Sequence, residues 1–465
     1  MQWKNDPMSK TDNYTFLTQA PIPQVIGTMA VPTIISMLVS NMYNIVDSYF
    51  VGQINTQATA AVGIVASLQF MIQAFSFFFG NGTGNFISRE LGRKRHKQAR
   101  IMASTGFFYT LVTALLILAA GEIWLEELAV ILGSTPTIQP YTETYMSIIL
   151  LGTPFIMCSF CINNQMRFEG YAKYSMYGIV SGAVLNCVLD PLLIFGLNMG
   201  LAGAAWATVI GQAVGFMVMW RMSRMRGAIH YSWRRISLDK SYIKEILAGG
   251  TPSISRQGLA CLAVIMLNHS AGMFGDAAIA AMSIVNRVTM FINSVIIGLG
   301  QGFQPMCGFC YGAALYRRVK QGFWFCVRIG VGFHLFWTVI LFIFSAQTIA
   351  LFRDDPHVIA IGVNALRFQA ATYILSSFMM MSNMMMQTCR MPWKANFVAA
   401  ARQGLFFIPL VLTLPRCLDL TGLEMTQAVS DVLSTLCTIP ITWHTFRQMT
   451  KAEGVTIAGD KAMRP

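Results

Sequence analysis

The sequence predicts an all-α integral membrane protein with twelve transmembrane helices, arranged as two six-helix lobes related by a pseudo-two-fold axis. Three observations predict this fold class. The chain is 55% hydrophobic and only 11% charged, apolar stretches of about 20 residues recur along it, and its second half repeats its first. A soluble protein with this composition would have a surface that water cannot wet.

The apolar stretches are each long enough to cross about 30 Å of hydrocarbon as a helix. They cover residues 24–50, 58–87, 100–120, 141–165, 176–196, 201–221, 246–271, 278–306, 323–345, 357–386, 396–415 and 426–446. A helix is expected for each because it pairs its own backbone groups where no water is present. The alternating ten-residue strands of a membrane barrel do not occur in the sequence.

The basic residues lie in alternate loops. These loops contain Arg89, Arg93, Lys94, Arg95, Lys97, Arg100, Arg167, Lys173, Arg221, Arg224, Arg226, Arg234, Arg235, Lys240, Lys244, Arg317, Arg318, Lys320, Arg390, Lys394, Arg447 and Lys451. The opposite loops contain only Arg353 and Arg416. The positive-inside rule therefore places both termini in the cytoplasm and the chain in the cell (inner) membrane. It also accounts for the net charge of +13 through topology and lipid contact rather than a nucleic-acid partner.

A shift of 220 residues aligns the two halves, so that Pro32 meets Pro252 and Gly52 meets Gly272. Six spans per copy is an even number, which predicts parallel repeats about an axis along the membrane normal. The predicted units are a cytoplasmic N-terminal segment without a signal peptide (1–22), an N-lobe (23–221), a cytoplasmic linker (222–244), a C-lobe (245–447) and a cytoplasmic tail (448–465).

Two glycine runs, residues 80–84 and 298–302, lack the Gly-Lys-Ser/Thr ending of a phosphate-binding loop. Close helix packing is the expected role of these glycines. No nucleophile–base set or metal cluster occurs outside the apolar spans, so we expect no enzyme activity and no cofactor. Because no nucleotide-binding motif is present, any pumping must draw on an ion gradient.

Asp47 and Asp190 lie inside apolar spans, where an isolated carboxylate costs at least about 2.5–3.5 kcal/mol. Such a group needs a wet cavity, a partner, or a role in binding protons or ions. Asn186 lies four residues before Asp190 and therefore on the same helix face. Carboxylate, amide and hydroxyl oxygens suit a hard cation or a shared proton.

Several motifs resemble those of the MATE (multidrug and toxic compound extrusion) family, in its bacterial DinF-like and MepA-like branch. The matching pieces are residues 46–52, 186–196, 200–208 with Gln212, 302–305, 311–313, Arg402-Gln403, and Phe407 with Pro409. The resemblance implies H⁺- or Na⁺-driven antiport of drug-like, amphipathic and usually cationic compounds by a monomer. It also implies a coupling site of Asp47, Asn186, Asp190 and Thr208, which would hold Na⁺ if sodium is the coupling ion, and a hinge at Pro32.

The C-lobe departs from the branch that carries additional acids there, so we expect coupling through the N-lobe alone. The residues considered for a substrate cavity are Tyr43, Gln257, Arg287, Met379, Met380 and Asp431. Asp431 has two interpretations: an arginine or helix contact, or a role in coupling or substrate contact. Arg256, Arg287, Arg367 and Arg402 either bond carbonyls and Asp431 or snorkel, or they line the cavity and accept an anionic substrate.

Two other functions remain open at this stage. A flippase for a lipid-linked or anionic substrate of the same superfamily would explain the C-lobe arginines. A major facilitator transporter shares the two parallel six-span repeats, and its loop signature is loosely similar to residues 91–95. The motifs of spans 1 and 5 favour the MATE interpretation over both.

Overall fold

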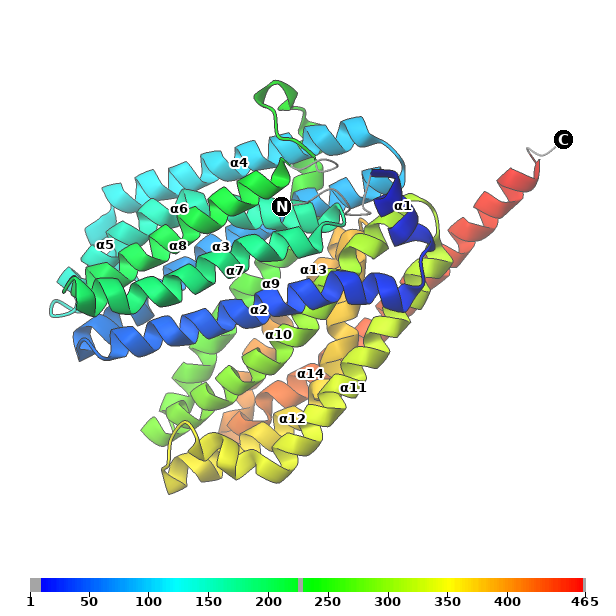
Figure 1. Ribbon diagram of the computed structural model, residues 1–465. Coiled ribbons are helices and arrows are strands. Elements are labelled where there is room, and N and C mark those ends of the chain that lie inside the picture. Colours follow the sequence, from blue (N-terminus) through cyan, green and yellow to red (C-terminus); the bar gives the residue numbers. More distant parts are fainter. Residues whose placement is uncertain (1–9, 225–228, 463–465) are drawn as a thin grey trace.

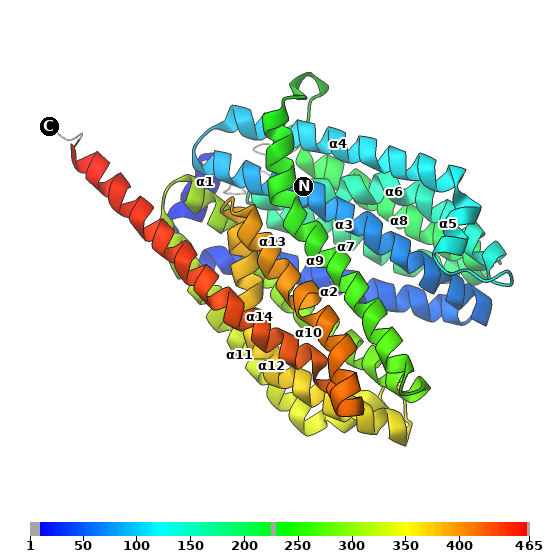
Figure 2. The same cartoon turned by 180° about the vertical axis from the view of Figure 1, so that it is seen from behind.

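The computed structural model describes residues 10–224 and 229–462, and every regular element within these ranges is a helix. Figure 1 shows two elongated helical bundles, coloured blue to green and green to red. They diverge at one end of the molecule and converge at the other, where the first described helix, α1 (Lys10–Gln19), lies. Figure 2 shows the same arrangement from behind. Part of the predicted linker, residues 225–228, lies outside the described residues.

The first bundle is built from the helices that precede the linker. They are α2 (Ile22–Gly52), α3 (Thr56–Gly92), α4 (His96–Ile123), α5 (Leu125–Ile131), α6 (Gln139–Phe168), α7 (Ala172–Pro191) with the π-helical η1 (Leu192–Gly196), and α8 (Gly200–Ser223). The short α1 (Lys10–Gln19) precedes them, and the 3-10 turn η2 (Trp233–Arg235) follows in the linker.

The second bundle contains the remaining helices. They are α9 (Lys240–Gly272), α10 (Asp276–Gly312), α11 (Tyr316–Ala350), α12 (Pro356–Thr388), α13 (Pro392–Ala400) with the π-helical η3 (Ala401–Leu405), and α14 (Phe407–Ala462). Asp239 caps the start of α9, because its carboxylate accepts a hydrogen bond from the Ser241 backbone N–H. This bond holds the pKa of Asp239 below its usual value.

Helix α14 is not continuous, because the chain reverses its direction within it. Leu418 and Asp419 leave the helical region, and Asp419 has a φ of 49°. Gly422 follows, and a Cβ at this position would overlap the Leu414 carbonyl oxygen. The residues from Pro392 onward therefore cross the bundle twice.

Ten segments of the described chain are long and apolar enough to cross a membrane. The difference from the twelve predicted spans has two physical causes. The segment Pro392–Glu453 counts once although it contains two passes. Helix α9 is not among the ten, because Arg256, Gln257, Asn268 and His269 lower its mean hydropathy. All twelve predicted spans are thus accounted for by helices.

Small residues bring the two bundles together at the converging end. A Cβ at Gly82 on α3 would lie 2.5 Å from the Ile246 carbonyl oxygen of α9, and one at Gly298 on α10 would lie 2.7 Å from the Ile34 Cα of α2. The prediction that these glycines serve close helix packing is confirmed. Glu245 on α9 adds ion pairs to Arg89 at 2.8 Å and to Arg390 at 2.6 Å.

Two arginines assigned to loops by the sequence lie inside the protein. Arg89 is 3% exposed within the last turn of α3, and Arg167 is 1% exposed within the last turn of α6. The prediction was wrong for both, because the helices extend beyond the apolar stretches and pack against the other bundle. Arg89 bonds across the contact to the Thr388 carbonyl and to Glu245, whereas Arg167 bonds to Asn81 and Asn164 within the first bundle.

Candidate functional site

Three helices of the first bundle bring the four predicted coupling residues together. Asp47 lies on α2, Asn186 and Asp190 on α7, and Thr208 on α8. The Asn186 Nδ2 donates to Asp190 Oδ1 at 3.4 Å and to Thr208 Oγ1 at 3.3 Å. Asp47 lies close enough to Asp190 for the charges to interact. The site therefore contains two carboxylates, one amide and one hydroxyl.

Three buried oxygens of this site accept no hydrogen bond from the described residues: Asp47 Oδ1, Asn186 Oδ1 and Asp190 Oδ2. A buried acceptor without a donor costs about 1–3 kcal/mol, and more when it is charged. No lysine or arginine within residues 10–224 and 229–462 forms an ion pair with either aspartate. A bound cation or proton would give these oxygens a partner and would also reduce the repulsion between the two carboxylates.

A cavity of about 80 Å³ lies between α2, α6, α7 and α8, and of the four predicted coupling residues Asn186 and Thr208 line it. This is the volume of about two to three water molecules. Its polar lining consists of Ser40, Tyr43, Ser159, Asn186, Thr208 and Gln212. Close approach of Gly182 on α7 to the Gly211 carbonyl of α8 brings the two polar helix faces together. Tyr43 is therefore part of the N-lobe site.

Two residues join this site that the sequence analysis did not assign to it. Tyr145 on α6 is buried and lies in hydrogen-bonding contact with Thr208. Gln212 follows Thr208 by four residues, and this spacing was a usable signal for a shared helix face. Tyr145 gave no such signal, because only the packing of α6 against α8 brings it to the site.

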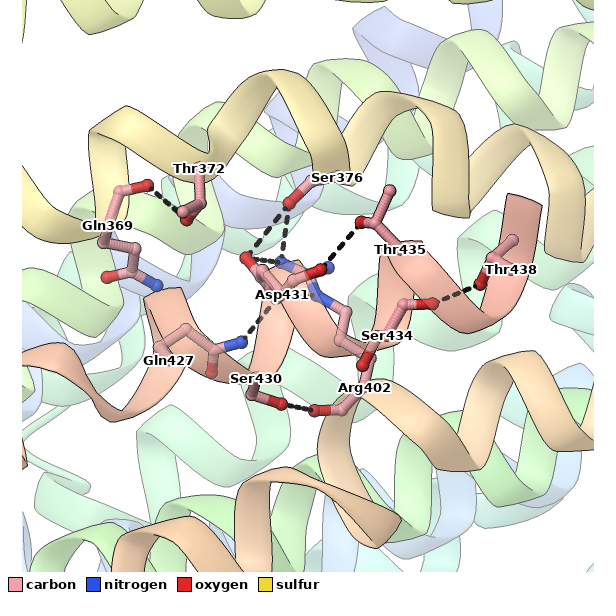
Figure 3. Close-up of polar contacts among 10 residues, drawn as sticks. All are labelled: Gln369, Thr372, Ser376, Arg402, Gln427, Ser430, Asp431, Ser434, Thr435 and Thr438. Carbon is pink, nitrogen blue, oxygen red and sulfur yellow. Dashed lines mark hydrogen bonds and ion pairs between the residues drawn. The ribbon is translucent and has the colours of Figure 1, made fainter. Parts of the chain in front are cut away.

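A second buried aspartate lies in the other bundle in a different environment (Figure 3). Asp431 is 0% exposed, and its Oδ1 accepts from Arg402 Nε at 2.8 Å and from Gln427 Nε2 at 2.9 Å. Its Oδ2 accepts from Ser376 Oγ at 3.3 Å and from Arg402 Nη2 at 3.4 Å. The interpretation of Asp431 as an arginine partner is confirmed by this geometry.

Two of the other three C-lobe arginines considered for the cavity, Arg256 and Arg367, donate hydrogen bonds within the protein. Arg256 Nη1 donates to Asn383 Oδ1 at 3.2 Å. Arg367 donates to Ser345 Oγ at 3.1 Å and to the Phe342 carbonyl at 3.2 Å. Arg287 is exposed on α10.

The remaining predicted residues lie apart from one another. Met379 is buried, and Met380 packs against the large core at the junction of α10, α11 and α12. Gln257 is partly exposed on α9. Pro32 is buried in α2, which continues through it as a helix. No contact joins these residues to the cavity beside Asn186, so their roles in substrate binding and hinge motion stay predictions.

Within the described ranges, no group of three or more His, Cys, Asp or Glu side chains is placed to hold a metal ion. The N-lobe oxygens have only two carboxylates among them. Such a set fits an ion that binds and leaves, as a transported cation must.

Comparison with known proteins identifies relatives over nearly the full length. The Multidrug export protein MepA of Staphylococcus haemolyticus (strain JCSC1435) is 26% identical over 426 residues, covering 91% of this chain and 94% of the relative. MepA of Staphylococcus aureus (strain N315) is 23% identical over 437 residues, covering 93% and 96%. These relatives are consistent with the MepA-like branch.

Solved structures share the fold. One described as the outward-facing conformation of a multidrug resistance MATE family transporter of the MOP superfamily has a TM-score of 0.89 at 22% identity, covering 95% of this chain and 99% of that chain. A MOP superfamily transporter from Pyrococcus furiosus Vc1, described as having a binding pocket of reverse polarity, has a TM-score of 0.89 at 22% identity, covering 95% and 100%.

The family model described as MatE matches this chain twice, at residues 32–192 and 252–413. The two blocks fall in the two bundles and begin at Pro32 and Pro252, the pair that the 220-residue shift aligned. MATE proteins are membrane transporters and not enzymes. Because the two matches together cover well over half of the sequence, the chain belongs to the MATE family.

Proposed function

We propose that this protein is a secondary antiporter that exports amphipathic, cationic drug-like compounds in exchange for H⁺ or Na⁺. Coupling occurs through Asp47, Asn186, Asp190 and Thr208. The observation that carries the proposal is the set of three buried oxygens that have no hydrogen-bond donor among the described residues, one of which belongs to Asn186 in the lining of a small cavity. These oxygens lack any basic partner among the described residues, so a mobile cation is the remaining source of positive charge.

Helix α2 supplies the mechanical link between the cation site and the lobe contact. It carries Asp47, and toward the converging end its Asn41 and Thr33 bond to α10 of the other lobe. The Thr33 hydroxyl donates to the Gly298 carbonyl at 2.7 Å. Cation binding at Asp47 removes charge repulsion on one end of α2, and Pro32 lacks the N–H that would stiffen the helix there. Repacking of α2 would then change the lobe contact.

The proposed orientation follows from charge. The converging end carries the basic loops and helix α1, so the positive-inside rule assigns it to the cytoplasm of the cell membrane. In this conformation the cytoplasmic halves are closed by the packing of α2 and α3 against α9 and α10. An exchange cycle then consists of cation entry from outside, drug release outward, and reopening to the cytoplasm. One chain holds the whole route, and so a monomer suffices.

Proteoliposomes provide the test. The purified protein is reconstituted with a fluorescent cationic dye inside, and either a pH step or a Na⁺ step is imposed. Dye efflux above the empty-liposome rate, driven by one of the two steps, is expected and identifies the ion. Equal efflux with and without each gradient would contradict antiport.

The flippase alternative rests on the C-lobe arginines. Among the four, Arg402 pairs with Asp431, and Arg367 donates to Ser345 and a backbone carbonyl. A flippase moves labelled lipid across the bilayer without an ion gradient, so the same vesicles loaded with fluorescent anionic lipid distinguish the two functions.

A further inference from the structure

Two arginines lie on either side of the lobe junction. Arg167 lies on α6 of the N-lobe and is 1% exposed, whereas Arg256 lies on α9 of the C-lobe and is partly exposed. Asn81 links their helices, because it accepts from Arg167 and donates to Ser253, which precedes Arg256 by three residues on α9. An arginine side chain stays protonated in proteins, so neither charge is removed by proton loss.

Only part of the Arg167 guanidinium has hydrogen-bond acceptors among the described residues. Its Nη2 donates to Asn164 Oδ1 at 2.6 Å and to Asn81 Oδ1 at 3.2 Å. Its Nε and Nη1 are buried and find no acceptor among the described residues. The side chain also lies over the Phe168 ring, 5.0 Å from the ring centroid. Its neighbours thus provide partial negative charge from amide oxygens and a ring face, and no full negative charge.

Arg256 shares this lack of a carboxylate. Its described hydrogen bond goes to the neutral Asn383. The acidic residue nearest to it along α9 is Glu245, which is already bound to Arg89 and Arg390. Charges are costly to bury without a partner of opposite charge. Water would satisfy the free N–H groups but would not neutralise the two charges.

We propose that the lobe junction is an anion site in which Arg167 and Arg256 hold one small monovalent anionic group. The two sources of such a group are a free chloride ion and the carboxylate of a transported compound. Guanidinium groups present planar donors that match a carboxylate and bind it through charge-assisted hydrogen bonds. The site lies apart from the N-lobe oxygens and does not depend on the proposed cation coupling.

The polar residues around the two arginines make the site dependent on conformation. Asn81 on α3 donates to Ser253 Oγ on α9 at 2.9 Å, and Gln387 on α12 donates to the same oxygen at 2.8 Å. The Asn81–Ser253 bond joins the two lobes. The site is therefore complete only while the converging ends are closed, and a bound anion stabilises that closed state.

The test uses the purified full-length protein in detergent, in a buffer whose only anion is a bulky sulfonate. Chloride, bromide or acetate is titrated into the protein, and the melting temperature is measured at each concentration. Acetamide, the uncharged analogue of acetate, is the control. Arg256→Gln removes a partly exposed charge that has one hydrogen bond, and Arg167→Gln removes the buried one. Arg328→Gln is the matched control, because Arg328 is exposed on α11.

A saturable rise in melting temperature is expected for the wild type and for Arg328→Gln. The midpoint should move at least about tenfold higher in Arg256→Gln, as expected for loss of a hydrogen bond to a charged group. A response to chloride and bromide assigns the site to a free ion. A response to acetate but not to halide or acetamide assigns it to a substrate carboxylate.

A crystal grown with bromide locates the anion in the wild type, so the proposal stays testable if Arg167→Gln does not fold. Anomalous signal between Arg167 and Arg256 supports a halide site. Equal responses in wild type and Arg256→Gln, or no response to any of the three anions, would overturn the proposal. Since binding is measured without a gradient, that outcome leaves the antiport proposal standing.

Discussion

Asp190 in the N-lobe and Asp431 in the C-lobe are both buried, but they differ in their partners. Each is 0% exposed, and each adjoins a π-helical segment: η1 begins two residues after Asp190, and η3 contains Arg402, the partner of Asp431. Asp431 accepts hydrogen bonds at both oxygens, whereas Asp190 Oδ2 accepts none from the described residues. Burial alone therefore does not separate the two acids, and the presence or absence of a fixed cation does.

The difference has an energetic meaning. Asp431 is paired with the Arg402 guanidinium, so neutralising this carboxylate would leave a buried positive charge without its partner. Asp190 and Asp47 have no such fixed charge among the described residues. Under the proposed function, the N-lobe therefore holds a movable charge and the C-lobe holds a static one.

The largest expected effect comes from removing the movable charge. Asp190→Asn and Asp47→Asn should each reduce gradient-driven dye efflux to the level of empty liposomes, because the amide cannot take up the cation. The melting temperature should change little, since neither carboxylate forms an ion pair in the described structure. The exposed Asp354→Asn serves as the control. Wild-type efflux in both variants would end the proposed coupling.

Breaking the static pair should affect stability instead. Arg402→Met leaves Asp431 buried without its cation, and the free energy of unfolding should fall by about 3–5 kcal/mol. The double variant Arg402→Met/Asp431→Leu should recover most of this loss, because both charges are then gone. The free energies of unfolding of the single and the double variant are measured in mixed detergent micelles. If the single variant instead keeps its stability and loses ion-driven efflux, Asp431 belongs to the coupling machinery.

A second buried ion pair extends the comparison to the lobe contact. Glu245→Gln removes the charge that holds Arg89 and Arg390, and Arg89 is itself 3% exposed. The contact between the converging ends of the two lobes should lose about 1–3 kcal/mol of stability. Hydrogen exchange at the converging ends of α3 and α9 should rise accordingly. Exchange equal to that of Glu127→Gln, an exposed acid in α5, would show that the pair does not hold the lobes together.

The sequence predicts this comparison only in part. Apolar length and the 220-residue repeat predict the two lobes, and the four-residue spacing predicts that Asn186 and Asp190 share a face. These signals are local or periodic. The partner of Asp431 stayed open because Arg402 lies on another span, and only packing decides whether they meet. The burial of Arg167 was missed for the same reason: its ligands Asn81 and Asn164 come from two helices, one of them far away in sequence.

The smallest predicted effect concerns Thr208, and measuring it tests the geometry of the N-lobe site most directly. Thr208→Val keeps the shape of the side chain but removes an oxygen that accepts from Asn186 at 3.3 Å. Loss of one hydrogen-bond partner is worth about 1 kcal/mol, which corresponds to about fivefold in affinity. The cation concentration for half-maximal efflux should rise by about this factor, with the maximal rate unchanged.

Thr208→Ser retains the hydroxyl and should behave as the wild type, which separates the role of the oxygen from that of the methyl group. Complete loss of efflux in Thr208→Val would mean that the hydroxyl does more than supply one oxygen. An unchanged half-maximal concentration would place the cation at Asp47 and Asp190 alone. In that case the movable charge of the N-lobe would depend on α2 and α7, without help from α8.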